Sequence, residues 1–381
     1  MGISRRIKLG ILTSSRADFG IYLPLLNHLK KESACFDLSI IAFGTHLSLF
    51  HGYTVEEIIK SGFEAKYQIS SILLNDNEES IATSYAITAM KFANFWAEHK
   101  KSFDCVLCLG DRFEMAAAVT AGLPFNISFA HIHGGETSLG AIDNVYRHMI
   151  SLASEFHFVS ARPFVEKIYS LVGKNAKCFM VGALSLDDVD KIFLPDKAEF
   201  KAKWKIDDEA PFVLVTVHPE TRSADKTIEH AKVMEEVLKE LTSNFNIVIS
   251  MPNSDAYNSH FRRIFKKLKA NYSDKVVLIE NFGRANYFAA MKYSQLIIGN
   301  SSSGIIEAAS FNRYVINIGD RQKGRLASDN VFHVPFDTHK ILSAIEKLKS
   351  KSFTGDNIYK IGNTAVSIAN ALKSQYIDLV K

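Results

Sequence analysis

The stretch Leu296–Ala309, LIIGNSSSGIIEAA, indicates the fold class of this chain. Leu296–Ile298 is a short apolar run of the kind that forms a buried parallel strand. The run stops at Gly299 and Asn300, three serines follow, and a helix is expected to start near Ile305. A strand, a small polar turn and a helix N-terminus in succession are typical of an α/β protein that binds an anion.

The polar residues of this stretch are candidates for ligand binding. The first N–H groups of a helix lack intrahelical partners, and the helix dipole adds roughly half a positive charge there. We therefore expect Ser301 and Ser302 to lie at an anion site, and Glu307, one turn into the helix, to accept hydrogen bonds from ribose hydroxyls. An ordinary capped helix is the alternative interpretation. The sequence is not a Walker loop, because GxxxxGK[ST] is absent.

The rest of the chain repeats the alternation of apolar strands with helical segments. This pattern predicts an α/β fold of two doubly wound, Rossmann-like parallel domains, with a junction around Leu184–Lys203. No GxGxxG follows the first strand, which argues against a dinucleotide cofactor. The expected strands are Ile7–Thr13, Asp37–Phe43, Phe103–Leu109, Asn126–His131, Glu155–Val159, Phe212–Val217, Asn246–Met251, Val276–Ile279 and Tyr314–Ile318, and the expected helices include Phe19–Lys31, Ser80–Lys100, Asp143–Ala153, Thr227–Leu241 and Thr364–Leu379.

Composition excludes several classes of function. The chain has 381 residues, 47% hydrophobic, and a net charge of +4 that is spread along the sequence, so we expect no nucleic-acid partner. The most basic run, Phe261–Lys275, is interpreted as the solvated face of a helix. No run of about 18 apolar residues occurs, so no membrane partner is expected. Four cysteines and the lack of a signal peptide predict a cytoplasmic protein.

Two groups of residues resemble metal or redox motifs. Cys105 and Cys108 form a CxxC, but they lie in an apolar strand where positions i and i+3 point to opposite faces, which favours core packing. His131, His133 and Glu136 could be metal ligands, but no further carboxylate or cysteine set accompanies them. We therefore expect no metal site and no cofactor.

Polar residues gather directly after the strands. In open parallel sheets the ligand crevice lies beyond the carboxyl ends of the strands, so Arg16, Asp111, Arg112, His133 and Glu136 are expected to converge. A cleft between the two domains is the expected ligand site.

Other interpretations of single residues remain open. Asp111 and Asp143 could each cap a helix. His218 could be a hydrogen-bonded interior histidine, although its place at a strand end beside Pro219 favours a functional role.

Eight motifs follow one another along the chain: TSSRADFG, LGDRFE, HIHGGE, IDNVYRH, VTVHPET, MPNSDA, NSSSGIIEAA and INIGDRQKGR. Each motif alone is weak, but the ordered set covers nearly the whole chain. Together they resemble one known family, the hydrolysing UDP-N-acetylglucosamine 2-epimerases of sialic and legionaminic acid biosynthesis.

The resemblance implies the glycosyltransferase-B-like fold of this family. It implies an N-terminal domain over 1–187 that carries the sugar chemistry and a C-terminal domain over 188–363 that binds UDP. The last helix, in 364–381, would cross back to the first domain. The resemblance also implies a UDP-sugar substrate, a UDP product, no cofactor and a homodimer or homotetramer.

Position by position, the resemblance also implies roles for single residues. It assigns acid–base chemistry to Asp111 and Asp143, implies a further acid–base role for either His133 or Glu136, and places His218 in the catalytic site. It assigns substrate or UDP contacts to Arg16, Arg112, His218, Asn253, Phe282, Ser301, Ser302, Glu307, Arg321 and Arg325.

One motif departs from the family pattern. Many relatives have HIEGGE, with a catalytic glutamate where this chain has His133, whereas Glu136 is kept. Either His133 or Glu136 takes the acid–base role, and the sequence leaves both open. The change also leaves open a second substrate, UDP-2,4-diacetamido-2,4,6-trideoxyglucose.

The implied reaction is an elimination followed by a hydration. A base removes the C2 proton while UDP leaves C1, and water then adds to the glycal with inversion at C2. This would convert UDP-N-acetylglucosamine to UDP and N-acetylmannosamine. Crowded carboxylates suit the acid–base work, because desolvation and mutual repulsion raise a carboxyl pKa towards neutrality. The alternatives are a non-hydrolysing epimerase, a glycosyltransferase of the same fold and a non-catalytic nucleotide-sugar sensor.

Overall fold

Seven parallel strands form the sheet of the first of two units into which the chain divides. The structure is a computed structural model that describes residues 5–207, 210–252 and 257–376. Unit 1 comprises Met1–Glu136, Asp143–Asp188 and Tyr359–Lys381, and unit 2 comprises Thr137–Ile142 and Val189–Ile358. The division therefore places the last helix with the first unit, and the short segment Thr137–Ile142 with the second.

The sheet of unit 1 has the order β3-β2-β1-β4-β5-β6-β7, and all its strand pairs are parallel. The sequence moves outwards from β1 in one direction and then from β4 in the other, as in a doubly wound sheet. The strands are β1 (Ile7–Thr13), β2 (Phe36–Phe43), β3 (Tyr67–Ile69), β4 (Cys105–Leu109), β5 (Phe129–Ile132), β6 (Phe156–Val159) and β7 (Lys177–Met180).

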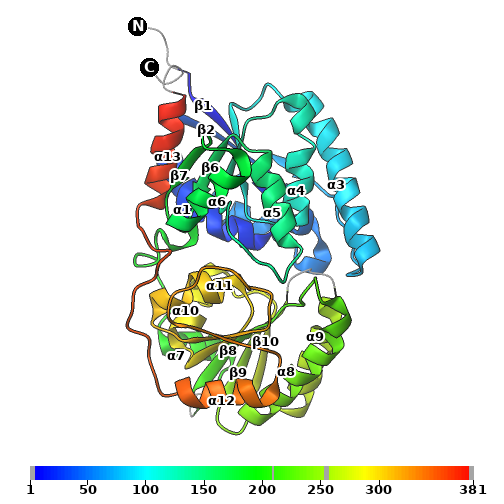
Figure 1. Ribbon diagram of the computed structural model, residues 1–381, viewed down its shortest axis with the longest axis vertical. Coiled ribbons are helices and arrows are strands. Elements are labelled where there is room, and N and C mark those ends of the chain that lie inside the picture. Colours follow the sequence, from blue (N-terminus) through cyan, green and yellow to red (C-terminus); the bar gives the residue numbers. More distant parts are fainter. Residues whose placement is uncertain (1–4, 208–209, 253–256, 377–381) are drawn as a thin grey trace. The chain divides into compact units, whose positions relative to one another are not determined.

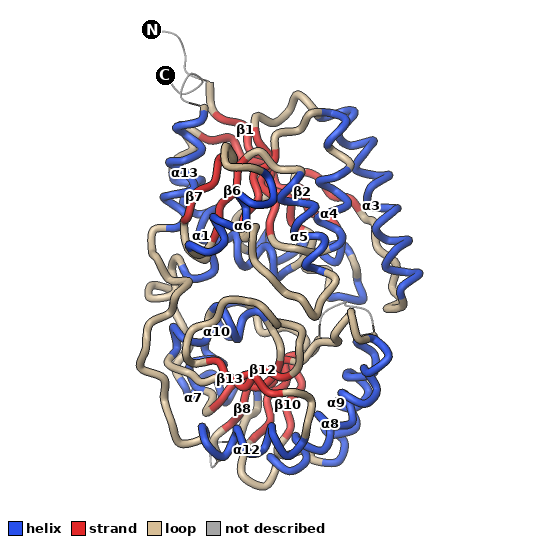
Figure 2. Tube along the Cα trace, viewed as in Figure 1, coloured by secondary structure: helices blue, strands red, loops and turns tan. Residues whose placement is uncertain are grey.

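Helices cover both faces of this sheet (Figure 2). Alternating side chains explain the two layers, because Leu9 and Ile11 of β1 point into one core and Leu12 into the other. Figure 1 shows α13, coloured red, beside α1, which it contacts. The helices of unit 1 are α1 (Arg16–Lys31), α2 (Val55–Lys60), α3 (Glu78–His99), α4 (Phe113–Thr120), α5 (Asp143–Leu152), α6 (Arg162–Val172) and α13 (Thr364–Gln375).

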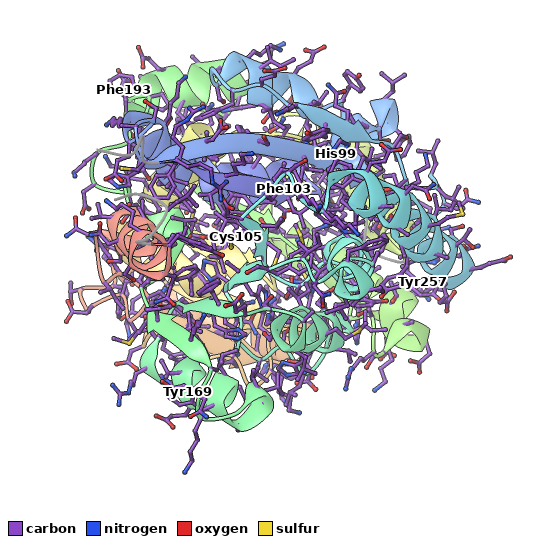
Figure 3. All side chains as sticks on the ribbon, turned by 90° about the horizontal axis from the view of Figure 1, so that it is seen from above. His99, Phe103, Cys105, Tyr169, Phe193 and Tyr257 are labelled. Carbon is purple, nitrogen blue, oxygen red and sulfur yellow. The ribbon has the colours of Figure 1, made fainter. Side chains whose placement is uncertain are left out.

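The CxxC pair is part of the core of unit 1, as the strand pattern predicts. Cys105 packs in the cluster on one face of the sheet and Cys108 in the cluster on the other. Both thiols are buried and unoxidised, and burial raises the pKa of Cys105 to about 12. In Figure 3, Cys105 lies among packed side chains, whereas Tyr169 of α6 lies at the periphery. These cysteines are therefore packing residues.

Unit 2 repeats the plan with six parallel strands in the order β10-β9-β8-β11-β12-β13. Its strands are β8 (Phe212–Thr216), β9 (Asn246–Ser250), β10 (Val276–Ile279), β11 (Leu296–Gly299), β12 (Val315–Ile318) and β13 (Val331–Val334). Its helices are α7 (Lys197–Trp204), α8 (Thr227–Leu241), α9 (Asn258–Asn271), α10 (Arg284–Tyr293), α11 (Ser302–Ile306) and α12 (Thr338–Leu348). No helix in the described part of the chain is long and apolar enough to span a membrane.

The sequence pattern located the central strands well and missed three others. The predicted strand Ile7–Thr13, the helix Thr227–Leu241 and the strand Val276–Ile279 have the bounds that the structure shows. The missed strands β3, β7 and β13 lie at sheet edges and are half exposed, so they lack the apolar run of a buried strand.

The expected helix after Ser301 is shorter than the sequence suggested. α11 has five residues, Ser302–Ile306, and Glu307 is its C-cap rather than a residue one turn into a longer helix. A 3-10 turn, Ala308–Phe311, follows directly. Because so few peptide dipoles are aligned, most of the anion binding expected here has to come from hydroxyl and N–H groups rather than from a helix dipole.

Candidate active site

In unit 1, four polar side chains follow three neighbouring strands. Asp111 follows β4, His133 and Glu136 follow β5, and Ser160 follows β6. Because β4, β5 and β6 are adjacent in the parallel sheet, their carboxyl ends lie together at one edge. The convergence that the sequence predicts therefore has a structural basis for Asp111, His133 and Glu136.

Asp111 forms an ion pair with Arg147 of α5. The arginine side chain is 2% exposed and the aspartate 27%. Arg147 also donates from its second terminal nitrogen to the backbone oxygen of Glu136 at 3.0 Å. A planar guanidinium can satisfy two acceptors in fixed directions, so Arg147 holds the Asp111 carboxylate near the HIHGGE loop.

His133 and Glu136 form the second half of this network. Nδ1 of His133 lies 2.8 Å from Oε1 of Glu136, and the same oxygen accepts a hydrogen bond from the Ser160 hydroxyl at 2.8 Å. Glu136 and Ser160 are almost fully buried, and His133 is 7% exposed. His133 also has a φ of +65°, a left-handed backbone conformation that residues other than glycine seldom adopt.

The other candidates of unit 1 lie at the starts of three helices. Asp143 is half-buried in the first turn of α5, four residues before Arg147, so the two share one helix face. Arg16 is the first residue of α1, after β1. Arg112 precedes α4 and pairs with the buried Glu114 at 2.8 Å, so its charge is partly compensated inside the protein. Burial raises the pKa of Glu114, and Arg112 opposes that rise.

The described residues show no group of three or more His, Cys, Asp or Glu side chains that could hold a metal ion. His131, one of the considered ligands, is instead hydrogen-bonded to the Ser151 hydroxyl at 3.0 Å and the Gly110 carbonyl at 2.8 Å. Burial lowers the pKa of His131 to about 3, so its ring is neutral. His131 therefore has a structural role beneath the loop that carries His133.

In unit 2, Asn300 connects the ends of two neighbouring strands. Its side-chain oxygen accepts from the His218 N–H at 2.7 Å, and its side-chain nitrogen donates to the His218 carbonyl at 2.9 Å. Its own carbonyl accepts from Gln322 at 2.9 Å and from Arg321 at 3.2 Å. Gly299 permits this geometry, because a Cβ there would overlap the Thr216 carbonyl oxygen. Asn300 thus fixes the loops that carry His218 and Arg321.

A second buried anchor is Glu220, which follows His218 by two residues. Its Oε1 accepts hydrogen bonds from the backbone N–H groups of Asp320 and Arg321. Burial raises the pKa of Glu220, and these two N–H groups oppose the rise. Glu220 therefore ties the β8 loop to the β12 loop.

Among the described residues, one hydroxyl of the serine stretch has no hydrogen-bond partner in the protein. Ser301 is the N-cap of α11, and its hydroxyl lies 2.9 Å from that of Ser303, which in turn lies 2.7 Å from the Tyr287 hydroxyl. Ser302 is half-buried, and its hydroxyl has no hydrogen-bond partner among the residues that the structure describes. Ser302 is therefore the hydroxyl of this turn best placed to bind a ligand.

The remaining candidates of unit 2 differ in accessibility. Phe282 is 5% exposed, stacked on Phe200 at 6.3 Å between ring centroids and in edge contact with Trp204 at 5.1 Å. Glu307 is buried, and Arg325 donates to the Gln322 side chain at 2.9 Å. Asn253 lies outside the described residues.

The segment Thr137–Ile142 joins Glu136 to Asp143 along the chain but packs within unit 2. The Leu139 N–H donates to the Lys323 carbonyl at 3.0 Å, and the Ile142 N–H donates to the Thr221 hydroxyl at 2.9 Å. At Gly140 a Cβ would overlap the Asp320 backbone, so only glycine permits this approach. Two candidate residues of unit 1 are thus connected through a segment fixed to the β8 and β12 loops.

The comparisons with known proteins agree with this arrangement. The family described as UDP-N-acetylglucosamine 2-epimerase matches residues 27–373. The chain belongs to this family. Its two parallel sheets form the glycosyltransferase-B-like fold of the UDP-N-acetylglucosamine 2-epimerases, so the predicted fold class is confirmed.

Two relatives and one solved structure illustrate the similarity. The chain is 33% identical to a Legionella pneumophila UDP-N,N'-diacetylbacillosamine 2-epimerase (hydrolyzing), covering 96% of both chains. It is 32% identical to a Campylobacter jejuni GDP/UDP-N,N'-diacetylbacillosamine 2-epimerase (hydrolyzing), covering 91% of this chain and 88% of the other. Neisseria meningitidis UDP-GlcNAc 2-epimerase, bound to UDP-GlcNAc, has a similar fold, with a TM-score of 0.78, 19% identity, and coverage of 97% of this chain and 100% of that one.

The sequence analysis did not identify several residues that position the candidate site residues of this chain. Arg147, Ser160, Glu220 and Asn300 make contacts that position the candidate residues, yet none was among the predicted site residues. Two of them could have been suspected from the sequence, because Arg147 lies in the IDNVYRH motif and Glu220 in the VTVHPET motif. Ser160 and Asn300 are small polar residues at strand ends, and many such residues have no role in a site.

Proposed function

We propose that the chain is a hydrolysing UDP-sugar 2-epimerase that releases UDP and a free sugar inverted at C2. The observation that carries this proposal is the network Asp111–Arg147–Glu136–His133, which gathers acid–base groups at the strand ends of unit 1 in a chain of the epimerase family. The printed names of two relatives at 32% and 33% identity, both "hydrolyzing", support the hydrolysing branch.

The proposed reaction has two stages. A base takes the C2 proton, the C2–H electrons form the C1=C2 double bond, and the C1–O electrons leave with UDP. Water then supplies the hydroxyl at C1 while an acid protonates C2 on the opposite face. Because elimination and hydration each move a C2 proton, two groups on opposite faces of the sugar are required, and Asp111, His133 and Asp143 are the candidates.

UDP would bind to unit 2 in this proposal. The loops that Asn300 and Glu220 fix carry His218 and Arg321, and the adjacent serine turn offers Ser302. The leaving diphosphate gathers negative charge, which a guanidinium and fixed N–H and O–H donors stabilise. This chemistry needs no metal and no nicotinamide, and dialysis against a chelator provides a simple check.

For the sugar, we propose UDP-N,N'-diacetylbacillosamine, the 2,4-diacetamido-2,4,6-trideoxy sugar named for both relatives. UDP-N-acetylglucosamine, as in the description of the family, is the second candidate. Both sugars carry a 2-acetamido group next to the leaving group, so the elimination and hydration would be the same. Competition between the two substrates, read as the ratio of their kcat/KM values, decides which sugar the enzyme uses.

Isotope incorporation tests the reaction. In deuterium oxide the released sugar should carry one deuterium at C2 with inverted configuration. In ¹⁸O-labelled water the label should enter C1 of the sugar and be absent from UDP, because the C1–O bond breaks. NMR and mass spectrometry of both products give the result. Unlabelled product incubated with enzyme in deuterium oxide controls for later exchange.

Three outcomes would contradict the proposal. An inverted sugar still attached to UDP would indicate a non-hydrolysing epimerase. A free sugar that is neither labelled nor inverted at C2 would indicate simple glycoside hydrolysis, and transfer to an acceptor would indicate a glycosyltransferase.

Replacing Ser302 by alanine should weaken UDP binding several-fold. One hydrogen bond to a ligand contributes about 0.5–1.5 kcal/mol, and the Ser302 hydroxyl is not engaged within the described protein. Titration calorimetry with UDP measures the change. The exposed Ser273→Ala, in the same unit, is the matched control and should bind UDP like the wild type. Unchanged affinity in both Ser302→Ala and Glu307→Ala would remove this turn from the proposed site.

A further inference from the structure

The imidazole of His133 is held on one side and open on the other. Nδ1 lies 2.8 Å from the Glu136 carboxylate, whereas Nε2 is buried and has no hydrogen-bond partner among the described residues. A buried ring nitrogen without a partner is unfavourable in a folded protein. The left-handed backbone at this residue, with φ +65°, adds a further unfavourable term. Such features persist where a ligand atom completes the arrangement.

The Glu136 carboxylate contacts the Nδ1 side of the His133 ring and not the Nε2 side. Its side chain is 0% exposed, and its Oε1 already receives the Ser160 hydroxyl as well as the His133 ring. An ionised carboxylate only accepts hydrogen bonds, so with Glu136 ionised the ring hydrogen is expected on Nδ1 and the lone pair on Nε2. The carboxylate therefore selects one tautomer of His133.

The surrounding charges fit this arrangement. Arg147 donates to the backbone oxygen of Glu136 and pairs with Asp111, so the cation next to the dyad has acceptors of its own. His131, which lies beneath the loop, is neutral because burial lowers its pKa to about 3. One oxygen of the Asp111 carboxylate is engaged by the Arg147 guanidinium, whereas the buried His133 Nε2 has no hydrogen-bond partner among the described residues.

We propose that His133 Nε2 is the base that takes the C2 proton of the UDP-sugar, and that Glu136 is a positioning residue acting through the imidazole ring. This inference rests on the proposed function. The Nε2 lone pair forms the new N–H bond, the C2–H pair becomes the C1=C2 bond, and the C1–O pair departs with UDP. The imidazolium that forms is stabilised by the ionised Glu136, and Ser160 orients that carboxylate.

The tautomer can be tested without turnover. ¹⁵N-histidine NMR of the full chain should show His133 with hydrogen on Nδ1 and none on Nε2, assigned by the signal lost in His133→Gln. Glu136→Gln should change or mix the tautomers, because an amide can donate as well as accept. Ser154→Ala removes a buried hydroxyl of the same unit that bonds to Ile150, and should leave the His133 signals unchanged.

Kinetics then tests whether Glu136 acts through His133. Glu136→Gln and His133→Gln should each lower kcat by about 10²–10⁴, with KM changed less than about three-fold. The double variant should be no slower than either single variant, because residues acting as one unit are not additive. Ser160→Ala should lose only several-fold, and Ser154→Ala should match the wild type.

The outcomes separate this inference from the proposed function. A wild type that epimerises while His133 carries its hydrogen on Nε2 would overturn the inference alone. Losses that multiply in the double variant would also overturn it, since Glu136 would then act independently. A wild type inactive on both UDP-sugars would overturn the proposed function, and with it the role of His133 as a base, while the tautomer measurement would still report whether Glu136 orients the ring.

Discussion

Replacing Asp111 by asparagine is expected to lower kcat by about 10²–10⁴, the usual contribution of a general acid or base. Asparagine has nearly the same shape but cannot take up or release a proton at neutral pH. It also leaves the buried guanidinium of Arg147 facing a neutral amide, so some loss of stability should accompany the loss of turnover. Steady-state rates must therefore be expressed per folded molecule, with the folded fraction taken from circular dichroism melting curves.

Two further variants separate chemistry from stability. Asp111→Glu keeps the negative charge beside Arg147 but moves the carboxylate by one methylene. Its kcat should therefore fall, while its melting temperature should stay close to that of the wild type. Asp37→Asn disrupts an exposed ion pair with Arg6 in the same unit, and it should change neither kcat nor the melting temperature. An Asp111→Asn enzyme with wild-type kcat per folded molecule would reduce Asp111 to a structural partner of Arg147.

Replacing Asn300 by alanine is expected to destabilise unit 2 by about 2–6 kcal/mol. The residue is fully buried, and the change leaves the His218 N–H and carbonyl without their partners, at about 1–3 kcal/mol each. UDP binding should fall as well, because the loops that carry His218 and Arg321 lose a shared support. Urea unfolding followed by Trp204 fluorescence measures the effect, with Trp96→Phe as the background, since these are the two tryptophans of the chain.

The matched control is Asn244→Ala, which removes an exposed amide of the same unit that donates a hydrogen bond to the neighbouring Ser243 hydroxyl at 3.1 Å. A surface change of this kind should alter the free energy of unfolding by less than about 0.5 kcal/mol. Asn300→Asp keeps the acceptor for the His218 N–H but sets a buried carboxylate oxygen against the His218 carbonyl, so the expected loss is at least as large as that of Asn300→Ala. If Asn300→Ala unfolds at the wild-type urea concentration, the proposed support of the two loops is wrong.

The sequence by itself determined the element types and the class of fold. The apolar runs of β1, β8 and β11 and the helical spacing of α8 are local patterns, so they can be recognised without knowing the partners of each segment. The opposite faces of Cys105 and Cys108 followed from strand geometry alone. Strand-end positions also identified Asp111, His133 and Glu136, since parallel strands bring their carboxyl ends to one edge.

The tertiary structure decided which side chains contact each other and which of their polar atoms have no partner among the described residues. Asp111 pairs with Arg147, 36 residues away, and Asn300 binds the backbone of His218, 82 residues away. Such partners depend on the strand order and on where each loop turns, and neither is encoded in a local period. The same holds for the enclosure of Glu136 beneath His133, for the five-residue length of α11, and for the packing of Thr137–Ile142 in unit 2. The sequence supplied the acid–base groups, and packing between distant segments decided which of their atoms remain open to a ligand.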